Sequence, residues 1–247
     1  MRTTSNPFFP LPSPAAALAS TRAAAERGAP AEQYALGMSY MDGAGVAKDP
    51  AAAIAWWCKA TAQDYHAAHL ALGTAFQFGI GDKPDPAQSA SWYRKAADLG
   101  LPVAQHAMGM LAMGQPGHTR DVDAAREWFR KASAQGYAPS QAFYGAMLMK
   151  EISPEWIELG LALVRKAVAQ NDAQGQFILA RCYEHGHGVA RDDAKAAALY
   201  EHAALGGSKP AQQSIATMYE RGQGVAANPV KAAKWRQIAD KPVPGPR

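Results

Sequence analysis

One motif recurs about every 36 residues along most of the 247-residue chain, and this period constrains the fold more than any other feature. In each copy an apolar or aromatic residue precedes a small one, at Leu36-Gly37, Leu72-Gly73, Met108-Gly109, Tyr144-Gly145, Leu179-Ala180 and Ile215-Ala216. A second landmark follows the small residue by about 19 positions, at Trp56, Trp92, Trp128, Leu163, Leu199 and Trp235. Two landmarks that keep their offset through six copies indicate stacked supersecondary units, each of which needs its neighbours to bury its apolar face.

Each copy carries signals for two helices. In the first copy, residues 31–41 have helical apolar spacing and are followed by a glycine-containing loop. Gly43 suits the left-handed conformation that ends a helix, and Asp49-Pro50 suits the start of the next one as N-cap and first helical residue. The sequence therefore predicts an all-α solenoid of about six helix hairpins.

The fourth copy departs most from this plan. It lacks the Gly-x-Gly loop, is one residue short around Lys150–Pro154, and carries Leu163-Val164 in place of an aromatic pair. In every copy we expect the small residue to lie where the paired helices cross, because a larger side chain would push them apart. The aromatic landmark is expected to fill the space between successive pairs.

The pattern divides the chain into four segments. Residues 1–14 contain several prolines and are predicted to be a disordered leader rather than a signal peptide, whose apolar stretch would be unbroken. Residues 15–28 are predicted to form a capping helix, because the open end of a solenoid needs one. Residues 29–240 are the predicted repeat domain, and 241–247 a disordered tail.

Charge and cysteine content narrow the classes of partner and compartment. The net charge is only +4, and the basic residues are interleaved with acidic ones along the sequence. Nucleic-acid binders usually carry a clustered basic face instead. No apolar run reaches 18 residues, so we expect no membrane span. The two cysteines, Cys58 and Cys182, favour a reducing compartment. We therefore expect a cytoplasmic protein that binds no nucleic acid, with a periplasmic or secreted location as the alternative and the oligomeric state open.

A known repeat family shares these features. Tyr34-Ala35-Leu36-Gly37, the loop Gly43-x-Gly45-Val46, Asp49, and Trp56-Trp57 with Lys59-Ala60 together resemble the Sel1-like repeat, a relative of the tetratricopeptide repeat with a longer loop between its helices. The resemblance covers about residues 29–240. It implies a right-handed superhelix of α-hairpins that acts as an adaptor or scaffold for protein complexes. Bacterial members are often tied to signalling, the cell envelope, secretion or host contact.

In tetratricopeptide-type stacks the first helix of each pair lines the concave face, which gives a predicted partner-binding surface. Counting from the small residue of each copy, it consists of Met38, Met41, Asp42, Thr74, Gln77, Phe78, Met110, Met113, Met149, Lys150, Arg181, Glu184, His185, Glu220 and Arg221. The early copies offer mainly methionine, which suits adaptable binding surfaces, and the last two offer charges. A partner segment of matching amphipathic order is expected. Alternatively, Met38, Met110 and Met149 only pack against neighbouring helices.

Catalytic and metal-binding patterns are weak. Cys182, His185 and His187 are ligand types for zinc or copper, but no second ligand pair accompanies them. His187 stands where other copies have Ala44, Ile80 or Gln223, so we expect its position to tolerate any residue. The sequence has no Gly-x-Ser-x-Gly elbow, Walker loop or His-Glu-x-x-His motif. We predict a protein-binding scaffold with no enzymatic activity, cofactor or metal. The alternative is a periplasmic or secreted protein that neutralises a toxin or binds peptidoglycan fragments.

Overall fold

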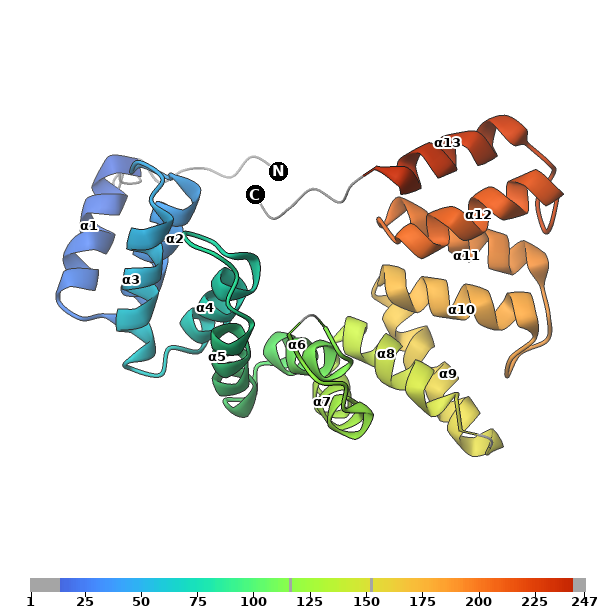
Figure 1. The fold of residues 1–247 in the computed structure, drawn as a ribbon, viewed down its shortest axis with the longest axis horizontal. Coiled ribbons are helices and arrows are strands. Elements are labelled where there is room, and N and C mark those ends of the chain that lie inside the picture. The colour runs from blue at the N-terminus through green and yellow to red at the C-terminus, as the bar shows by residue number, and fades with distance from the viewer. Residues whose placement is uncertain (1–13, 116, 152, 242–247) are drawn as a thin grey trace, which may run out of the picture. The chain divides into compact units, whose positions relative to one another are not determined.

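The computed structural model describes residues 14–115, 117–151 and 153–241, which contain helices and no strand. The helices are α1 (Pro14–Glu26), α2 (Pro30–Asp42), α3 (Pro50–Thr61), α4 (His66–Phe78), α5 (Pro86–Asp98), α6 (Pro102–Ala112), α7 (Val122–Ala134), α8 (Ala138–Leu148), α9 (Pro154–Ala169), α10 (Ala173–His185), α11 (Asp193–Leu205), α12 (Lys209–Arg221) and α13 (Pro229–Asp240) (Figure 1). The predicted all-α fold is confirmed. None of these helices is long and apolar enough to cross a membrane.

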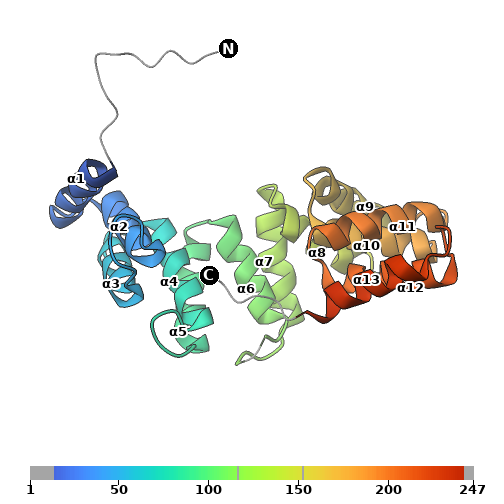
Figure 2. The ribbon, with the colours of Figure 1, turned by 90° about the horizontal axis from the view of Figure 1, so that it is seen from above.

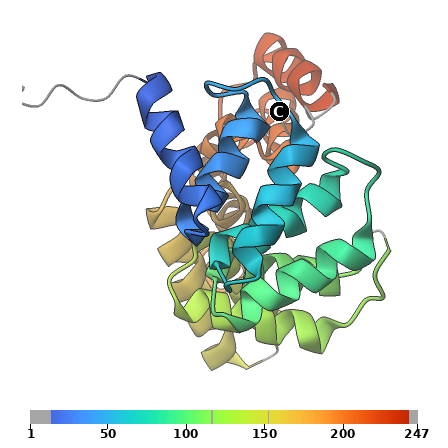
Figure 3. The ribbon, with the colours of Figure 1, turned by 90° about the vertical axis from the view of Figure 1, so that its left-hand side faces the viewer.

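Within the described residues, six hairpins follow helix α1, and we call the first helix of each hairpin helix A and the second helix B. The helices fall into two compact units, unit 1 (residues 1–104) and unit 2 (residues 105–247), with the boundary inside α6. In unit 1, α1 packs against α2 (Figure 3). In unit 2, each helix from α10 to α13 packs against the next one in the chain, and Figure 2 shows these four helices running alongside one another.

The two predicted terminal segments are described only in part. Helix α1 begins at Pro14 and ends at Glu26, so it occupies most of the predicted capping segment 15–28. Residues 1–13 of the predicted leader and residues 242–247 of the predicted tail lie outside the described residues. Ala25 of α1 is buried, and its carbonyl accepts a hydrogen bond from Gln33 Nε2 of α2 at 3.2 Å. Helix α1 therefore covers the start of the first hairpin.

Short polar side chains set where the B helices begin, except at α9, whose N-cap Ser153 makes no capping hydrogen bond. Each accepts a hydrogen bond from the backbone N–H three residues later, at 2.9–3.0 Å, and these N-caps are Asp49, Asp85, Asp121, Asp192 and Asn228. Such a cap satisfies one of the N–H groups that a helix start leaves unpaired. The N-cap predicted at Asp49 in the first copy is confirmed.

The paired helices cross closely at the small residue of each copy. A Cβ added to Gly73 would lie 2.6 Å from the Tyr93 ring, and one added to Gly109 would lie 2.5 Å from the Phe129 ring. The crossing position is as predicted, but the aromatic that meets it is the residue after the landmark. Trp56, the landmark of the first copy, is only half-buried and lies under the Lys59 ammonium, 3.7 Å from the ring centroid.

The fourth hairpin reaches a close crossing by a different route. A Cβ added to Gly145 of α8 would lie 2.6 Å from the Gly160 carbonyl oxygen, and one added to Gly160 of α9 would lie 2.5 Å from the Gly145 oxygen. Val164 stands where the other copies place an aromatic ring, so two glycines bring the backbones together and fill the space. Helix α9 has 16 residues, whereas the other B helices have 12 or 13.

Buried glutamines connect the two helices of a hairpin. One glutamine near the start of helix A is buried in five copies, at Gln33, Gln105, Gln141, Gln176 and Gln212. Gln135 Nε2 donates to Gln105 Oε1 at 2.8 Å, and Gln170 Nε2 donates to Gln141 Oε1 at 3.0 Å. Because buried amides need partners, these bonds hold the end of one helix B to the start of the hairpin's own helix A.

The crossing is directly testable at Gly109. We expect Gly109→Ala to lower the free energy of unfolding by about 1–3 kcal/mol because the new methyl overpacks against Phe129. Without this overpacking, Ala would stabilise the helix by about 1 kcal/mol relative to Gly. Urea denaturation measures the change. In the double variant with Phe129→Leu the Gly109→Ala cost should shrink, and additive effects of the two substitutions would contradict the crossing.

His106 predicts a pH dependence of stability. Its ring lies among Phe129, Tyr137 and Phe143, with Nδ1 2.9 Å from Ser140 Oγ, and burial lowers its pKa from 6.5 to about 4. Between these values the unfolded chain binds more protons than the folded one, so stability falls as the pH falls. The loss from pH 7 to pH 4 should be about 3 kcal/mol larger in the wild type than in His106→Gln. Equal losses in urea denaturation would contradict this.

Candidate partner-binding site

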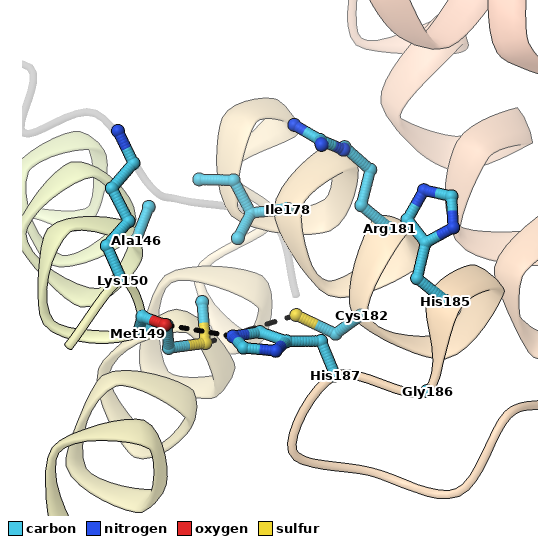
Figure 4. A pocket seen from close by; sticks show the side chains of 9 residues that line it. All are labelled: Ala146, Met149, Lys150, Ile178, Arg181, Cys182, His185, Gly186 and His187. Carbon is cyan, nitrogen blue, oxygen red and sulfur yellow. Dashed lines mark hydrogen bonds between the residues drawn. The ribbon is translucent and has the colours of Figure 1, made fainter. Parts of the chain in front are cut away.

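Residues of the A helices in unit 2 line two successive hollows. The first, of about 580 Å³, lies between α8 and α10 and is lined by Ala146, Met149, Lys150, Ile178, Arg181, Cys182, His185, Gly186 and His187 (Figure 4). The second, of about 320 Å³, is lined by Glu184, Pro210, Gln213, Ser214, Thr217, Met218, Arg221 and Gln223. The structure thus brings together six residues of the predicted surface: Met149, Lys150, Arg181 and His185 in the first hollow, and Glu184 and Arg221 in the second.

The floor of the first hollow is apolar and contains two polarisable sulfur atoms. Met149 and Cys182 are 5% and 4% exposed, and Cys182 Sγ lies 4.0 Å from Met149 Sδ. Burial raises the pKa of the Cys182 thiol, so the group stays neutral at physiological pH. Ile178, one turn earlier on α10, adds a branched side chain. These three side chains offer a surface suited to an aliphatic group.

Cationic side chains flank this floor. Lys150 and Arg181 are exposed, and within the described chain neither forms an ion pair with a carboxylate. Figure 4 shows them extending in the same direction on either side of Ile178. His185 lies at the far edge, with Nε2 3.7 Å from Glu184 Oε2. The hollow therefore combines an apolar floor with two positive charges that no carboxylate of the described residues neutralises.

His187 closes the hollow from the loop of the fifth copy. Its Nε2 lies 2.9 Å from the carbonyl oxygen of Met149, and because a carbonyl only accepts, this nitrogen carries the proton. The loop itself is pressed onto α9, since a Cβ added to Gly188 would lie 2.6 Å from Ile157. The prediction that this loop position tolerates any residue was incomplete, because here it bonds to the end of α8.

The second hollow is polar and contains both signs of charge. The Tyr200 hydroxyl donates to Glu184 Oε2 at 2.6 Å, which fixes the carboxylate beside the first hollow. Burial and this hydrogen bond raise the pKa of Tyr200. Arg221 also lines this hollow. The Glu220 carboxylate instead forms an ion pair with Arg236 of α13 and accepts a hydrogen bond from it at 2.6 Å.

In unit 1 most of the predicted surface residues contact neighbouring side chains. Met38 and Met41 are half-buried and pack in the apolar cluster around Trp57 and Leu72. Thr74 Oγ1 and Gln77 Oε1 both bond to the Tyr93 hydroxyl, at 3.1 and 2.7 Å.

Two predicted residues of unit 1 are open to solvent. Asp42 is exposed, and Phe78 is 49% exposed.

In unit 2, Met110 and Met113 are half-buried against the cluster that contains Phe129. Packing between helices, the alternative considered for the methionines, therefore accounts for much of their surface, and their part in binding stays a prediction.

Five residues of the first hollow were absent from the list of the predicted surface: Ala146, Ile178, Cys182, Gly186 and His187. Ala146 lies one position after Gly145, where the count from the small residue already directs a side chain into the groove, and Cys182 lies two positions after Ala180, so the helical period was a usable signal for both. His187 gave no such signal, because its partner is a carbonyl of the irregular fourth copy. Among the described residues, no group of three or more His, Cys, Asp or Glu is placed to hold a metal ion.

Comparison with protein families identifies the family to which these repeats belong. The model of the Sel1 repeat matches residues 33–65, 66–101, 102–137, 173–208 and 209–239, which together make up more than half of the sequence. The chain belongs to the Sel1 repeat family. The unmatched stretch between the third and fourth matches is the irregular fourth copy, whose Gly-x-Gly loop is replaced by the longer helix α9.

Solved structures share this fold. A protective antigen of uropathogenic Escherichia coli is 28% identical with a TM-score of 0.80, over 92% of this chain and 49% of that one. This chain thus spans about half the length of that protein. A Sel1 repeat protein of Oxalobacter formigenes is 24% identical with a TM-score of 0.80, over 93% and 98% of the two chains. An immunity protein of Pseudomonas aeruginosa is 19% identical with a TM-score of 0.56, over 96% and 87%. No curated protein matches the sequence.

The His187 contact is testable by substitution. We expect His187→Ala to lower the free energy of unfolding by about 1 kcal/mol, since it removes a hydrogen bond to the end of α8. His187→Gln, which keeps a donor, should recover part of the loss. The neighbouring His185→Ala, whose side chain is exposed, is the matched control and should change stability little. Equal losses for His185→Ala and His187→Ala in urea denaturation would contradict the assignment.

Proposed function

We propose that this chain is a non-enzymatic adaptor that binds a segment of a partner protein on the A-helix surface of unit 2. Sel1 repeat proteins generally bind other proteins and typically act as scaffolds rather than as enzymes. The observation that carries the proposal is the gathering of six predicted surface residues around two successive hollows on α8, α10 and α12.

The chemistry of the two hollows supports recognition of a chain with ordered side chains. The first has an apolar floor with positive charges, and the second has polar groups with Glu184 and Arg221. A peptide that lies across α10 would meet the two environments in sequence. Pockets that receive successive side chains are how groove-binding domains obtain specificity.

A second candidate is a toxin-neutralising protein of the periplasm or cell envelope. Immunity proteins of Pseudomonas aeruginosa share this fold at 18 and 19% identity. Both cysteines of this chain are free thiols, which supports the cytoplasmic location of the first candidate. The two candidates differ in the identity of the bound protein, so one capture experiment separates them.

Site-specific photo-cross-linking in the native cell tests the proposal. A photoreactive residue placed at His185 or Gln213, both exposed beside the hollows, should form an adduct with a partner protein. The same residue placed at Lys166 of α9 or Ala198 of α11, exposed on B helices, is the matched control and should form none. Mass spectrometry identifies the adduct, and a toxin found there would favour the second candidate. Adducts from the B-helix positions alone would contradict the proposed surface.

A further inference from the structure

We infer that the first hollow receives an acidic segment of the partner protein, with an aliphatic side chain on the floor of Met149, Ile178 and Cys182 and a carboxylate between Lys150 and Arg181. The inference rests on the proposed function and names the chemistry of the partner. It differs from the methionine-rich surface predicted from the sequence, because the hollow lies in the last half of the chain.

The floor calls for an apolar side chain rather than a polar one. Met149 and Cys182 are nearly buried, and their sulfur atoms contact each other, so no strong hydrogen-bonding group is directed from them into the hollow. The carbonyl oxygen of Met149 is already bonded to His187 Nε2. An aliphatic side chain that covers this floor removes apolar surface from water without leaving a polar group unpaired.

The flanking charges call for a carboxylate. Several exposed cations of unit 2 have a carboxylate partner: Arg191 with Asp193 at 2.9 Å, Lys195 with Asp192 at 3.0 Å and Arg236 with Glu220 at 2.6 Å. Lys150 and Arg181 have none within the described chain. A carboxylate of the partner that enters between them gains charge-assisted hydrogen bonds and displaces no internal ion pair.

The neighbouring carboxylate favours a protein over a nucleic acid. Glu184 lines the second hollow, lies 3.7 Å from His185 of the first, and is held there by the Tyr200 hydroxyl. A nucleic-acid strand carries a phosphate at every nucleotide, so a strand that follows the A helices would bring a negative charge against Glu184. A peptide avoids this repulsion, because a neutral or basic residue can follow its acidic portion.

Selection of random peptides on the immobilised full-length chain tests the inference. We expect the wild type to enrich peptides in which Asp or Glu adjoins Leu, Ile, Val or Met. The best of these synthetic peptides should bind Lys150→Glu/Arg181→Glu at least about tenfold more weakly by fluorescence anisotropy. The control Lys166→Glu/Lys234→Glu makes the same change in net charge on exposed B-helix positions and should bind as the wild type does.

A second variant tests the floor without touching the charges. Ala146 lines the hollow and is half-buried, so Ala146→Phe should fill the space and lower the affinity for the selected peptide by a similar factor. Thermal unfolding followed by circular dichroism shows that the variants stay folded. Rising salt should weaken binding of the peptide to the wild type and have little effect on what remains in the charge-reversed variant.

Several outcomes overturn the inference, and they are separable from failure of the proposed function. Enriched peptides without acidic residues, or no enriched peptide, would overturn it even if cross-links at His185 and Gln213 persist, and protein binding would then stand. Absence of those cross-links as well would remove the proposed function itself. If single-stranded RNA bound to the wild type but not to Lys150→Glu/Arg181→Glu, the two cations would instead form a phosphate-binding site, which would overturn the inference.

Discussion

The close crossing of each helix pair at a residue with little or no side chain is the contact on which the rest of the repeat depends. Gly73 and Gly109 admit the rings of Tyr93 and Phe129, and a single added methyl would meet those rings. In the fifth copy, Ala180 and Tyr200 share one buried cluster. Because protein interiors are close-packed, this contact fixes the spacing of the two helices and therefore where each helix A presents its outer side chains.

The irregular fourth copy shows what happens when this contact changes. Gly145 and Gly160 bring α8 and α9 together without an aromatic ring, and the longer helix α9 takes the place of the glycine loop. The end of α8 then carries Met149 and Lys150 toward α10. The loop of the fifth copy closes the floor through His187, which bonds to Met149. The first hollow thus forms where an irregular hairpin meets a regular one, so its lining is not repeated along the chain.

Much of the fold follows from sequence patterns, and much of the site does not. The period, the small residues and the Asp-Pro starts predict helix pairs because each acts within one hairpin. The glutamines bridge elements 30 residues apart and look like ordinary polar helix residues in the sequence. The period also continues unbroken through α6, where the boundary between the two units falls. For the methionines, the helical period gives the direction of a side chain but not its burial, which depends on how closely the next helix packs.

The most direct test of this account is the methyl NMR spectrum of the chain labelled at its nine methionines, recorded as an acidic peptide selected on the wild type is added. The account predicts that the Met149 methyl signal shifts with saturation, because Met149 forms the floor of the hollow. The Met38 and Met41 signals of unit 1 should stay in place. Shifts at Met38 and Met41 with an unchanged Met149 signal would contradict the account and return the binding surface to the methionines of the first copies.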